Sequence, residues 1–225
     1  MARVTAFGLF VLTIVSCARG DVDSDSEVTA GGVRVDLATN LGVIQVEVYP
    51  EKAPLSAGDF LEYVDSGRYS AASFYRVVRP DNDNGDPKIS VIQGGVRNTD
   101  NAEASSAAAE DQQSQSEAMG IVHETTEQTG LRHTDGALSL ARTDPGTGSA
   151  RAFFIVIGDQ PSLDFGGMRN KDGQGFAVFG RVTGGMDVVK AINALPGDAP
   201  VENAYVKGQI LEEPIAFTAQ RSVGE

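Results

Sequence analysis

Short runs of alternating apolar and polar residues recur along most of this chain, which is the pattern of half-buried β-strands. Residues 33–37 and 43–48 alternate in this way with Asn40-Leu41-Gly42 between them, and this arrangement predicts a β-hairpin. Similar runs follow at 74–78, 89–93, 137–141, 153–157, 177–182 and 214–219. The chain is therefore expected to be mainly β.

Two segments show helical spacing instead. In residues 54–67, Pro54 suits the first helical turn and Gly67 ends the helix. In residues 184–197, Pro196 and Gly197 stop a second short helix. The residues expected to face inward are Phe60, Leu61, Val64, Met186, Val189 and Ile192. Many strands with one helix near each end predict a closed antiparallel barrel capped by helices.

The N-terminal segment has the features of an export signal. Arg3 is the only charge before the apolar run at 5–16, which is too short to span a bilayer, so residues 1–16 are expected to be a signal peptide. The run ends at Cys17, the only cysteine, and "IVSC" resembles the bacterial lipobox, in which the cysteine is lipidated. Cleavage after Ala18 remains the alternative and would give a soluble exported protein. Residues 17–32 then form the lipidated cysteine and a flexible acidic tether.

Composition and charge restrict the kinds of partner that the chain is expected to bind. The chain has 225 residues, a net charge of −13 and a pI near 4.5, which argues against nucleic acid or an anionic membrane surface as the main partner. Any membrane contact is expected through the lipid anchor alone, and a monomer is expected. One domain should span 33–219, with a low-complexity surface insertion at 98–119 and a C-terminal tail at 220–225.

Common catalytic and metal-binding motifs are missing from the sequence. The only histidines, His123 and His133, lie ten residues apart without metal-ligand spacing around them. The segment "DNDNG" at 81–85 resembles a calcium loop only faintly, because Ile92 stands where the bidentate glutamate should be. A solvated turn is the favoured interpretation. Neither a metal nor a cofactor is expected.

Arg76 is unusual because it lies in the middle of an apolar, strand-like run. A buried guanidinium is costly without a partner, so this side chain either points to water or faces a site that needs a fixed cation. Alternation predicts Phe74, Arg76 and Val78 on one face of the strand and Tyr75 and Val77 on the other.

Five short motifs in order identify a family. The segments "FYRVV", "VIQGG", "GALSLAR", "FFIVIGDQPSLDF" and "FAVFGRV" together resemble the cyclophilin-type peptidyl-prolyl cis/trans isomerases, particularly exported bacterial members, over residues 33–217. The resemblance implies an eight-stranded antiparallel closed barrel capped by two α-helices, with a shallow groove on its outer face. It also implies rotation of prolyl bonds without a nucleophile or a metal.

The resemblance assigns roles to individual residues. Arg76 matches the catalytic arginine, and Gln93 matches the glutamine that hydrogen-bonds the substrate backbone and steadies the arginine. Gly94 and Gly95 would let the chain turn closely beside the groove. The implied substrate-binding residues are Tyr75, Val91, Ala141, Arg142, Phe154, Leu163 and Phe176. Of these, Phe154, Leu163 and Val91 would line the proline pocket, Phe176 its rim, and Ala141 and Arg142 the strand-like contact with the residue before proline. Three positions depart from the animal-type pattern, namely Ser90, Ala152 and Ser162, where an aromatic, a glutamine and a tryptophan are usual.

The expected function is prolyl isomerisation on unfolded or extended exported polypeptides, on the periplasmic side of a bacterial cell envelope. Prolyl isomerisation is slow enough to limit folding, which gives such an enzyme a use. One alternative is a module of the same fold that binds proline-containing segments with little turnover, which Ser90 and Ala152 favour. A weaker alternative is an envelope scaffold whose contacts lie in residues 98–119.

Overall fold

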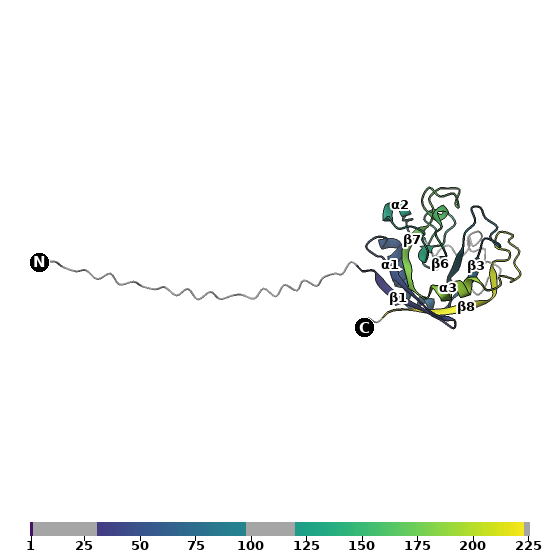
Figure 1. Cartoon of the computed structure of the whole chain (residues 1–225), viewed down its shortest axis with the longest axis horizontal. Helices are drawn as coiled ribbons and strands as arrows, with labels where there is room; N and C mark the ends of the chain where they lie inside the picture. Colours follow the sequence, from purple (N-terminus) through teal and green to yellow (C-terminus); the bar gives the residue numbers. More distant parts are fainter. Residues whose placement is uncertain (2–30, 98–119, 223–225) are drawn as a thin grey trace. The chain divides into compact units, whose positions relative to one another are not determined.

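The described residues form a closed barrel of eight antiparallel strands. The computed structural model describes Met1 and residues 31–97 and 120–222, and the barrel order is β1-β2-β7-β5-β6-β4-β3-β8 (Figure 1). The strands are β1 (Val33–Thr39), β2 (Gly42–Val48), β3 (Ala72–Val78), β4 (Val91–Val96), β5 (Ala137–Leu140), β6 (Ala152–Val156), β7 (Ala177–Gly184) and β8 (Ile210–Arg221). The predicted eight-stranded barrel is confirmed.

Several predictions fall outside the described residues. These are the signal peptide at 1–16, lipidation of Cys17, most of the tether at 17–32 and the insertion at 98–119. Among the residues that the structure describes, no helix is long and apolar enough to cross a membrane.

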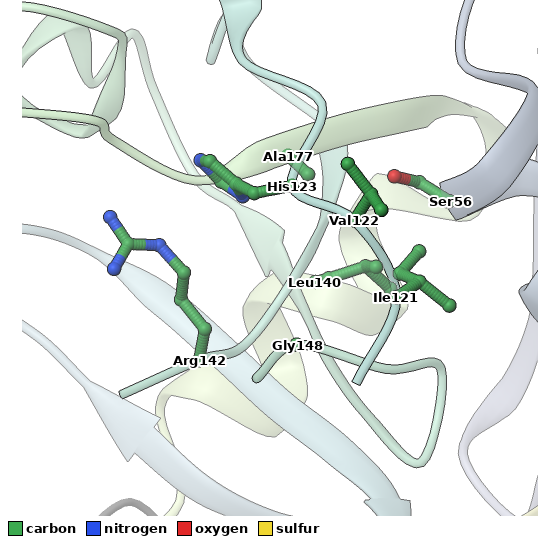
Figure 2. A pocket seen from close by; sticks show the side chains of 8 residues that line it. All are labelled: Ser56, Ile121, Val122, His123, Leu140, Arg142, Gly148 and Ala177. Atoms are coloured by element: carbon green, nitrogen blue, oxygen red, sulfur yellow. The ribbon is translucent and has the colours of Figure 1, made fainter. Parts of the chain in front are cut away.

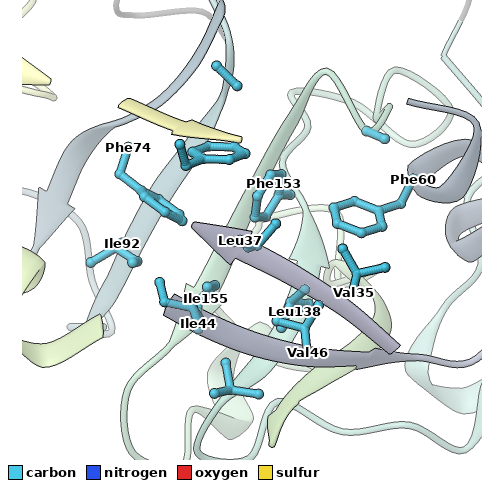
Figure 3. Close-up of a cluster of buried hydrophobic side chains, with 14 of the residues drawn as sticks. Val35, Leu37, Ile44, Val46, Phe60, Phe74, Ile92, Leu138, Phe153 and Ile155 are labelled. Carbon is cyan, nitrogen blue, oxygen red and sulfur yellow. The ribbon is translucent and has the colours of Figure 1, made fainter. Parts of the chain in front are cut away.

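Both predicted helices are present and bury apolar faces in the barrel core. The helices are α1 (Pro54–Asp65) and α3 (Met186–Asn193), and a single turn, α2 (Thr126–Thr129), lies between β4 and β5. The Phe60 ring of α1 lies 5.4 Å from Phe153 and 5.1 Å from Phe179, edge-on to the first. Figure 3 shows Phe60, Phe74 and Phe153 among the aliphatic side chains of the interior.

The fourth strand begins later than the sequence predicts. Its predicted range was 89–93, whereas β4 spans Val91–Val96. The Ile89 N–H donates to the Asp83 carboxylate at 2.9 Å, so this residue is held by a side chain in the preceding loop and not by a neighbouring strand. At the other end, Gly94 and Gly95 pair with Phe153 and Ala152 of β6 and extend the strand.

A β-bulge in β3 overturns the predicted alternation around Arg76. Phe74 pairs with Gly94 and Arg76 pairs with Gln93, so Tyr75 is the extra residue of the bulge. Phe74 and Val77 therefore lie in the interior core, whereas Arg76 does not share a face with Phe74. The bulge, which alternation cannot anticipate, turns Arg76 out of the barrel.

The two glycines opposite the bulge allow close packing inside a strand, and they do not form the turn that was predicted. A Cβ on Gly94 would lie 2.7 Å from the Phe74 ring, and one on Gly95 would lie 1.9 Å from the Arg151 carbonyl oxygen. Gly95 also has a φ of +139°, which other residues rarely adopt. Both positions thus require glycine for the β3–β4–β6 pairing beside Arg76.

Candidate active site

A row of side chains crosses three neighbouring strands on the outer face of the barrel. Arg76 of β3 pairs with Gln93 of β4, which pairs with Phe154 of β6. Their chain neighbours Ile92 and Phe153 belong to the interior core, so alternation directs Gln93 and Phe154 outward. With strands about 4.8 Å apart, the backbones of Arg76 and Phe154 are separated by roughly 10 Å. A small ring and its amide fit across this distance.

Arg76 is fixed by neutral amide oxygens. Its Nη1 donates to Gln93 Oε1 at 3.0 Å, and its Nε and Nη2 donate to Gln209 Oε1 at 2.9 and 2.7 Å. The Tyr205 ring lies 5.6 Å from the guanidinium carbon. Burial lowers the pKa of Arg76 from its usual value, but an arginine keeps its proton at physiological pH. The site therefore holds an oriented cation, which contacts the amides of Gln93 and Gln209 and the ring of Tyr205.

Gln93 links Arg76 to Tyr75. Its Oε1 accepts from Arg76, while its Nε2 donates to the Tyr75 hydroxyl at 3.1 Å. Burial raises the pKa of Tyr75, so the phenol stays neutral and can accept this bond. Tyr75 is itself buried and contacts the site through Gln93.

Gln209 was not found from the sequence. Its side chain is 0% exposed, and its Nε2 donates to the Asn82 carbonyl at 2.8 Å while its Oε1 receives Arg76. It lies 133 residues from Arg76 and directly precedes β8, whose Ile210 pairs with Arg76. No motif marks this position, and only the pairing of β3 with β8 brings it to the site.

An outer apolar cluster lies beside the arginine. It consists of Val78, Ile89, Val91, Ala137, Phe154, Val156, Leu163 and Val178, with Leu131, Ala141 and Phe176 packed against it. The structure thus brings together five residues predicted for the groove, namely Val91, Ala141, Phe154, Leu163 and Phe176. The rings of Phe154 and Phe176 meet edge-on at 5.2 Å. Leu163 is 0% exposed and so supports the cluster from within.

A buried histidine, also missed from the sequence, supports Phe154. The His133 ring stacks on Phe154 at 6.0 Å and 11°, with its Nδ1 2.7 Å from Asp164 and its Nε2 3.0 Å from Ser139 Oγ. Burial lowers the pKa of His133, so the ring is neutral. For Asp164, burial alone would raise the pKa, but the hydrogen bonds from His133 outweigh it and the pKa is lowered. This assigns Nδ1 as donor to Asp164 and Nε2 as acceptor from Ser139.

The Ser139–His133–Asp164 arrangement is not a nucleophilic triad. Such a triad needs an accessible serine, and Ser139 is 0% exposed. The network instead fixes one ring plane against the outer cluster. The sequence carried no signal for it, because Asp164 is 31 residues from His133 and lies on a different loop.

Arg142 is bound by its side chain to the loop that follows β6. Its Nε donates to the Gly175 carbonyl at 2.8 Å, its Nη1 lies 2.8 Å from Asp172, and its guanidinium stacks on Phe176 at 5.3 Å. The Ala141 N–H already donates to the Ala152 carbonyl at 2.9 Å. Arg142 thus stabilises Phe176 at the rim of the groove. It also lies in the segment that was expected to contact the residue before proline.

A small pocket adjoins Arg142. It is lined by Ser56, Ile121, Val122, His123, Leu140, Arg142, Gly148 and Ala177. Figure 2 shows Arg142 and His123 on one side of it and Ser56 on the other. The His123 Nε2 lies 3.2 Å from the Gln174 carbonyl, and burial lowers the pKa of this histidine.

The segment that resembled a calcium loop contains a buried ion pair. Asp83 accepts two hydrogen bonds from Arg169, at 2.7 and 2.8 Å, with side-chain exposures of 0% and 4%. The expectation of a solvated turn is therefore wrong for Asp83, because Arg169 comes from a distant loop to cover it. In residues 31–97 and 120–222, no group of three potential metal ligands was found.

The three positions that depart from the animal-type pattern lie around the groove. Ile89, beside Ser90, joins the outer apolar cluster and adds an aliphatic side chain near the missing aromatic. Ala152 pairs with Gly95 next to the row that contains Phe154. The Ser162 carbonyl accepts the Arg169 N–H at 3.1 Å, so this segment is fixed by its backbone.

Comparisons with known proteins agree with this geometry. The family model for cyclophilin type peptidyl-prolyl cis-trans isomerase/CLD matches residues 34–211. The chain is 35% identical over 162 residues to a peptidyl-prolyl cis-trans isomerase of Acinetobacter baylyi, covering 72% of each protein. It is 29% identical to peptidyl-prolyl cis-trans isomerase B of Escherichia coli, covering 80% of this chain and 99% of that relative.

Solved structures share the fold. A cyclophilin type isomerase of Cryptosporidium parvum superposes with a TM-score of 0.58 at 18% identity, covering 86% of this chain and 99% of that one. A second structure of that protein, obtained in the presence of the dipeptide Ala-Pro, has the same TM-score and covers 85% of this chain.

Proposed function

This chain belongs to the cyclophilin-type peptidyl-prolyl cis-trans isomerases, and we propose that it rotates prolyl bonds at the groove between Arg76 and Phe154 by means of a fixed hydrogen bond from the arginine. The observation that carries this proposal is the row of Arg76, Gln93 and Phe154 on three adjacent strands. The row sets a cationic donor beside an apolar surface of suitable size for a proline ring.

The chemistry needs neither a nucleophile nor a metal. Rotation is opposed by the double-bond character of the C–N bond, with a barrier of about 18–20 kcal/mol. In the twisted state the nitrogen is pyramidal and basic, so a donor aimed at it stabilises that state more than the planar one. The bonds to Gln93 and Gln209 use one N–H of each terminal nitrogen of Arg76. A guanidinium carries five N–H donors, so a further N–H would serve the prolyl nitrogen.

Phe154, Phe176 and Val91 would hold the proline ring. Phe154 is kept in one orientation by the stacked His133 ring and by the edge-on Phe176 ring. Because Phe154 already has a single orientation, it loses little conformational entropy when the proline ring binds. The ring and its amide are then held in the geometry that rotation needs. The Cryptosporidium parvum protein of the same fold was studied in the presence of the dipeptide Ala-Pro, which agrees with proline-containing peptides as the substrate class.

The test is an isomerisation assay on short prolyl peptides with Arg76→Ala. We expect kcat/KM to fall by about tenfold or more, with most of the loss in kcat, because the hydrogen bond strengthens only in the twisted state. Arg76→Lys, which keeps the charge but not the two-sided hydrogen bonding, should recover only part of the rate. Unchanged turnover in a folded Arg76→Ala protein would refute the assignment. Peptide binding without turnover in the native protein would instead support the binding-module alternative.

We further propose that the enzyme is exported and acts on extended polypeptides in the periplasm. The support is the apolar run at 5–16 followed by Cys17, together with the acidic, glycine- and serine-containing segment that joins it to the barrel. Lipidation of Cys17 would hold the barrel at a membrane, and the acidic charge of the chain gives no other attraction to anionic lipids.

A further inference from the structure

Tyr205 is an exposed aromatic residue next to the proposed catalytic arginine. It lies in the segment between α3 and β8 and is 48% exposed, and it belongs to neither apolar cluster. Its ring centroid is 5.6 Å from the Arg76 guanidinium carbon. The ring therefore borders the arginine while presenting about half of its surface to solvent. Packing of the core does not account for it.

Both the backbone and the hydroxyl of Tyr205 are held in place. Its N–H donates to Asn203 Oδ1 at 2.9 Å, and its carbonyl accepts from Asn84 Nδ2 at 3.1 Å. Its hydroxyl accepts from Arg169 Nη2 at 3.0 Å. A neighbour in its own segment and residues of two other loops thus hold Tyr205 in place.

Arg169 is in turn fixed by the buried carboxylate of Asp83. The two-pronged pair lies almost out of contact with water, and the Arg169 Nη1 also donates to the Pro87 carbonyl at 2.6 Å. A buried ion pair contributes little net stability, because desolvation offsets its attraction. What this pair does supply is a rigid support for the Tyr205 hydroxyl.

The order of the groups across the groove suggests what the ring contacts. Phe154, Gln93 and Arg76 follow one another on β6, β4 and β3, and Tyr205 lies beside Arg76 in the segment ahead of β8, the strand that pairs with β3. Ala141, where the residue before proline is expected, lies at the Phe154 side. A peptide with its proline on Phe154 and its prolyl nitrogen at Arg76 then continues toward Tyr205. The next residue is within one step of about 3.3 Å along an extended chain.

We propose that Tyr205 is a specificity-determining residue that receives the side chain following proline and favours an apolar or aromatic one. The inference rests on the proposed function at Arg76. A rigid aromatic face binds another ring or a branched aliphatic side chain with little loss of conformational entropy, whereas glycine gains nothing from it.

The experiment compares two peptides that differ only after proline, Ala-Pro-Phe and Ala-Pro-Gly with identical flanking groups. We expect the native protein to favour the phenylalanine peptide in kcat/KM by about tenfold, mostly through a lower KM. Tyr205→Ala should reduce this ratio to about one to two, while Tyr205→Phe, which keeps the ring, should retain most of it. Arg169→Met, which releases the hydroxyl, should give an intermediate ratio.

Tyr63→Ala is the matched control, because Tyr63 also stacks on an arginine, Arg68 at 5.0 Å, but on α1 away from the groove. Its ratio should equal the native one. If Tyr205→Ala lowered kcat/KM equally for both peptides, the ring would only cover Arg76. If kcat/KM stayed unchanged for both, the ring would contact no substrate. Either result would overturn the inference. Failure of the proposed function itself is separate, since it would appear as full turnover in Arg76→Ala with both peptides.

Discussion

Replacing Gln209 by leucine tests whether the orientation of Arg76, and not only its presence, drives isomerisation. Leucine is similar in volume and apolar, so it fits a fully buried site without a large cavity. It removes the acceptor of two hydrogen bonds from Arg76 and the donor to the Asn82 carbonyl. Of the two glutamines, only Gln93 would then hold the guanidinium.

The expected loss of rate in Gln209→Leu follows from these hydrogen bonds. A hydrogen bond to a charged group contributes about 1.5–3 kcal/mol, and each 1.4 kcal/mol corresponds to a factor of ten in rate. If that energy holds Arg76 in its productive orientation, Gln209→Leu should lower kcat by about ten- to a hundredfold with KM nearly unchanged. The loss cannot exceed that of Arg76→Ala. Leaving the Asn82 carbonyl without its partner should also cost about 1–3 kcal/mol of unfolding free energy.

The decisive measurement is a double-mutant cycle. The peptide isomerisation rate is measured for Gln209→Leu, Arg76→Ala and the double variant, and urea unfolding confirms that each is folded at the assay temperature. With Arg76 absent, Gln209→Leu should cause no further loss of rate, because it acts only through the arginine. Independent, additive losses would refute the reasoning and would point to a general loosening of the β3–β8 edge.

Three further predictions concern stability, inhibition and localisation. Burial lowers the pKa of His133 and of His123, so below about pH 6.5 the unfolded state binds protons that the folded state does not. The unfolding free energy should therefore fall as the pH drops below this value, and His133→Gln and His123→Gln should each remove part of that slope in urea titrations. Cyclosporin should inhibit the protein weakly, because Ser162 lacks the indole of the family tryptophan. Ser162→Trp should strengthen inhibition by about thirtyfold, or roughly 2 kcal/mol, whereas nanomolar inhibition of the native protein would contradict the expectation. The protein should sediment with membranes and Cys17→Ser should release it or leave it unprocessed, whereas an unmodified N-terminus at residue 19 would indicate soluble secretion.

The strands and helices could be predicted because their signals are local. Alternation over five to seven residues marks β1 and β2, and the spacing of Phe60, Leu61 and Val64 marks α1, all three of which are buried as expected. The bulge at Tyr75 could not be predicted in this way. It depends on the register of β3 against β4 and β8 together, and the chain of β3 contains no glycine or proline to signal it.

The groups that support the site were hidden for a similar reason. Gln93 was recognised through its motif, but Gln209 serves the same arginine from 133 residues away and is an unremarkable glutamine beside a glycine. The spacing around His133 indicates no metal site, and nothing in the sequence indicates its contacts with Phe154 and Asp164. Gln209 and His133 lie outside the motifs and reach Arg76 and Phe154 only through the topology of the barrel.

The side-chain partners of Arg76, Arg142 and Arg169 indicate different roles for these three arginines. Arg142 and Arg169 each form a two-pronged pair with a carboxylate, Asp172 and Asp83, so their charges are largely neutralised and they hold loops together. Arg76 is held as firmly, but by the amides of Gln93 and Gln209.

An amide fixes the direction of a guanidinium without cancelling its charge. In a partly buried site of low dielectric, the uncompensated charge keeps a stronger field at the position of the prolyl nitrogen. The lowered pKa of Arg76 reflects what that arrangement costs in desolvation. Neutral acceptors compensate the buried cation only in part, which raises the free energy of the protein before catalysis. The charge becomes favourable when the prolyl nitrogen turns basic in the twisted state beside it.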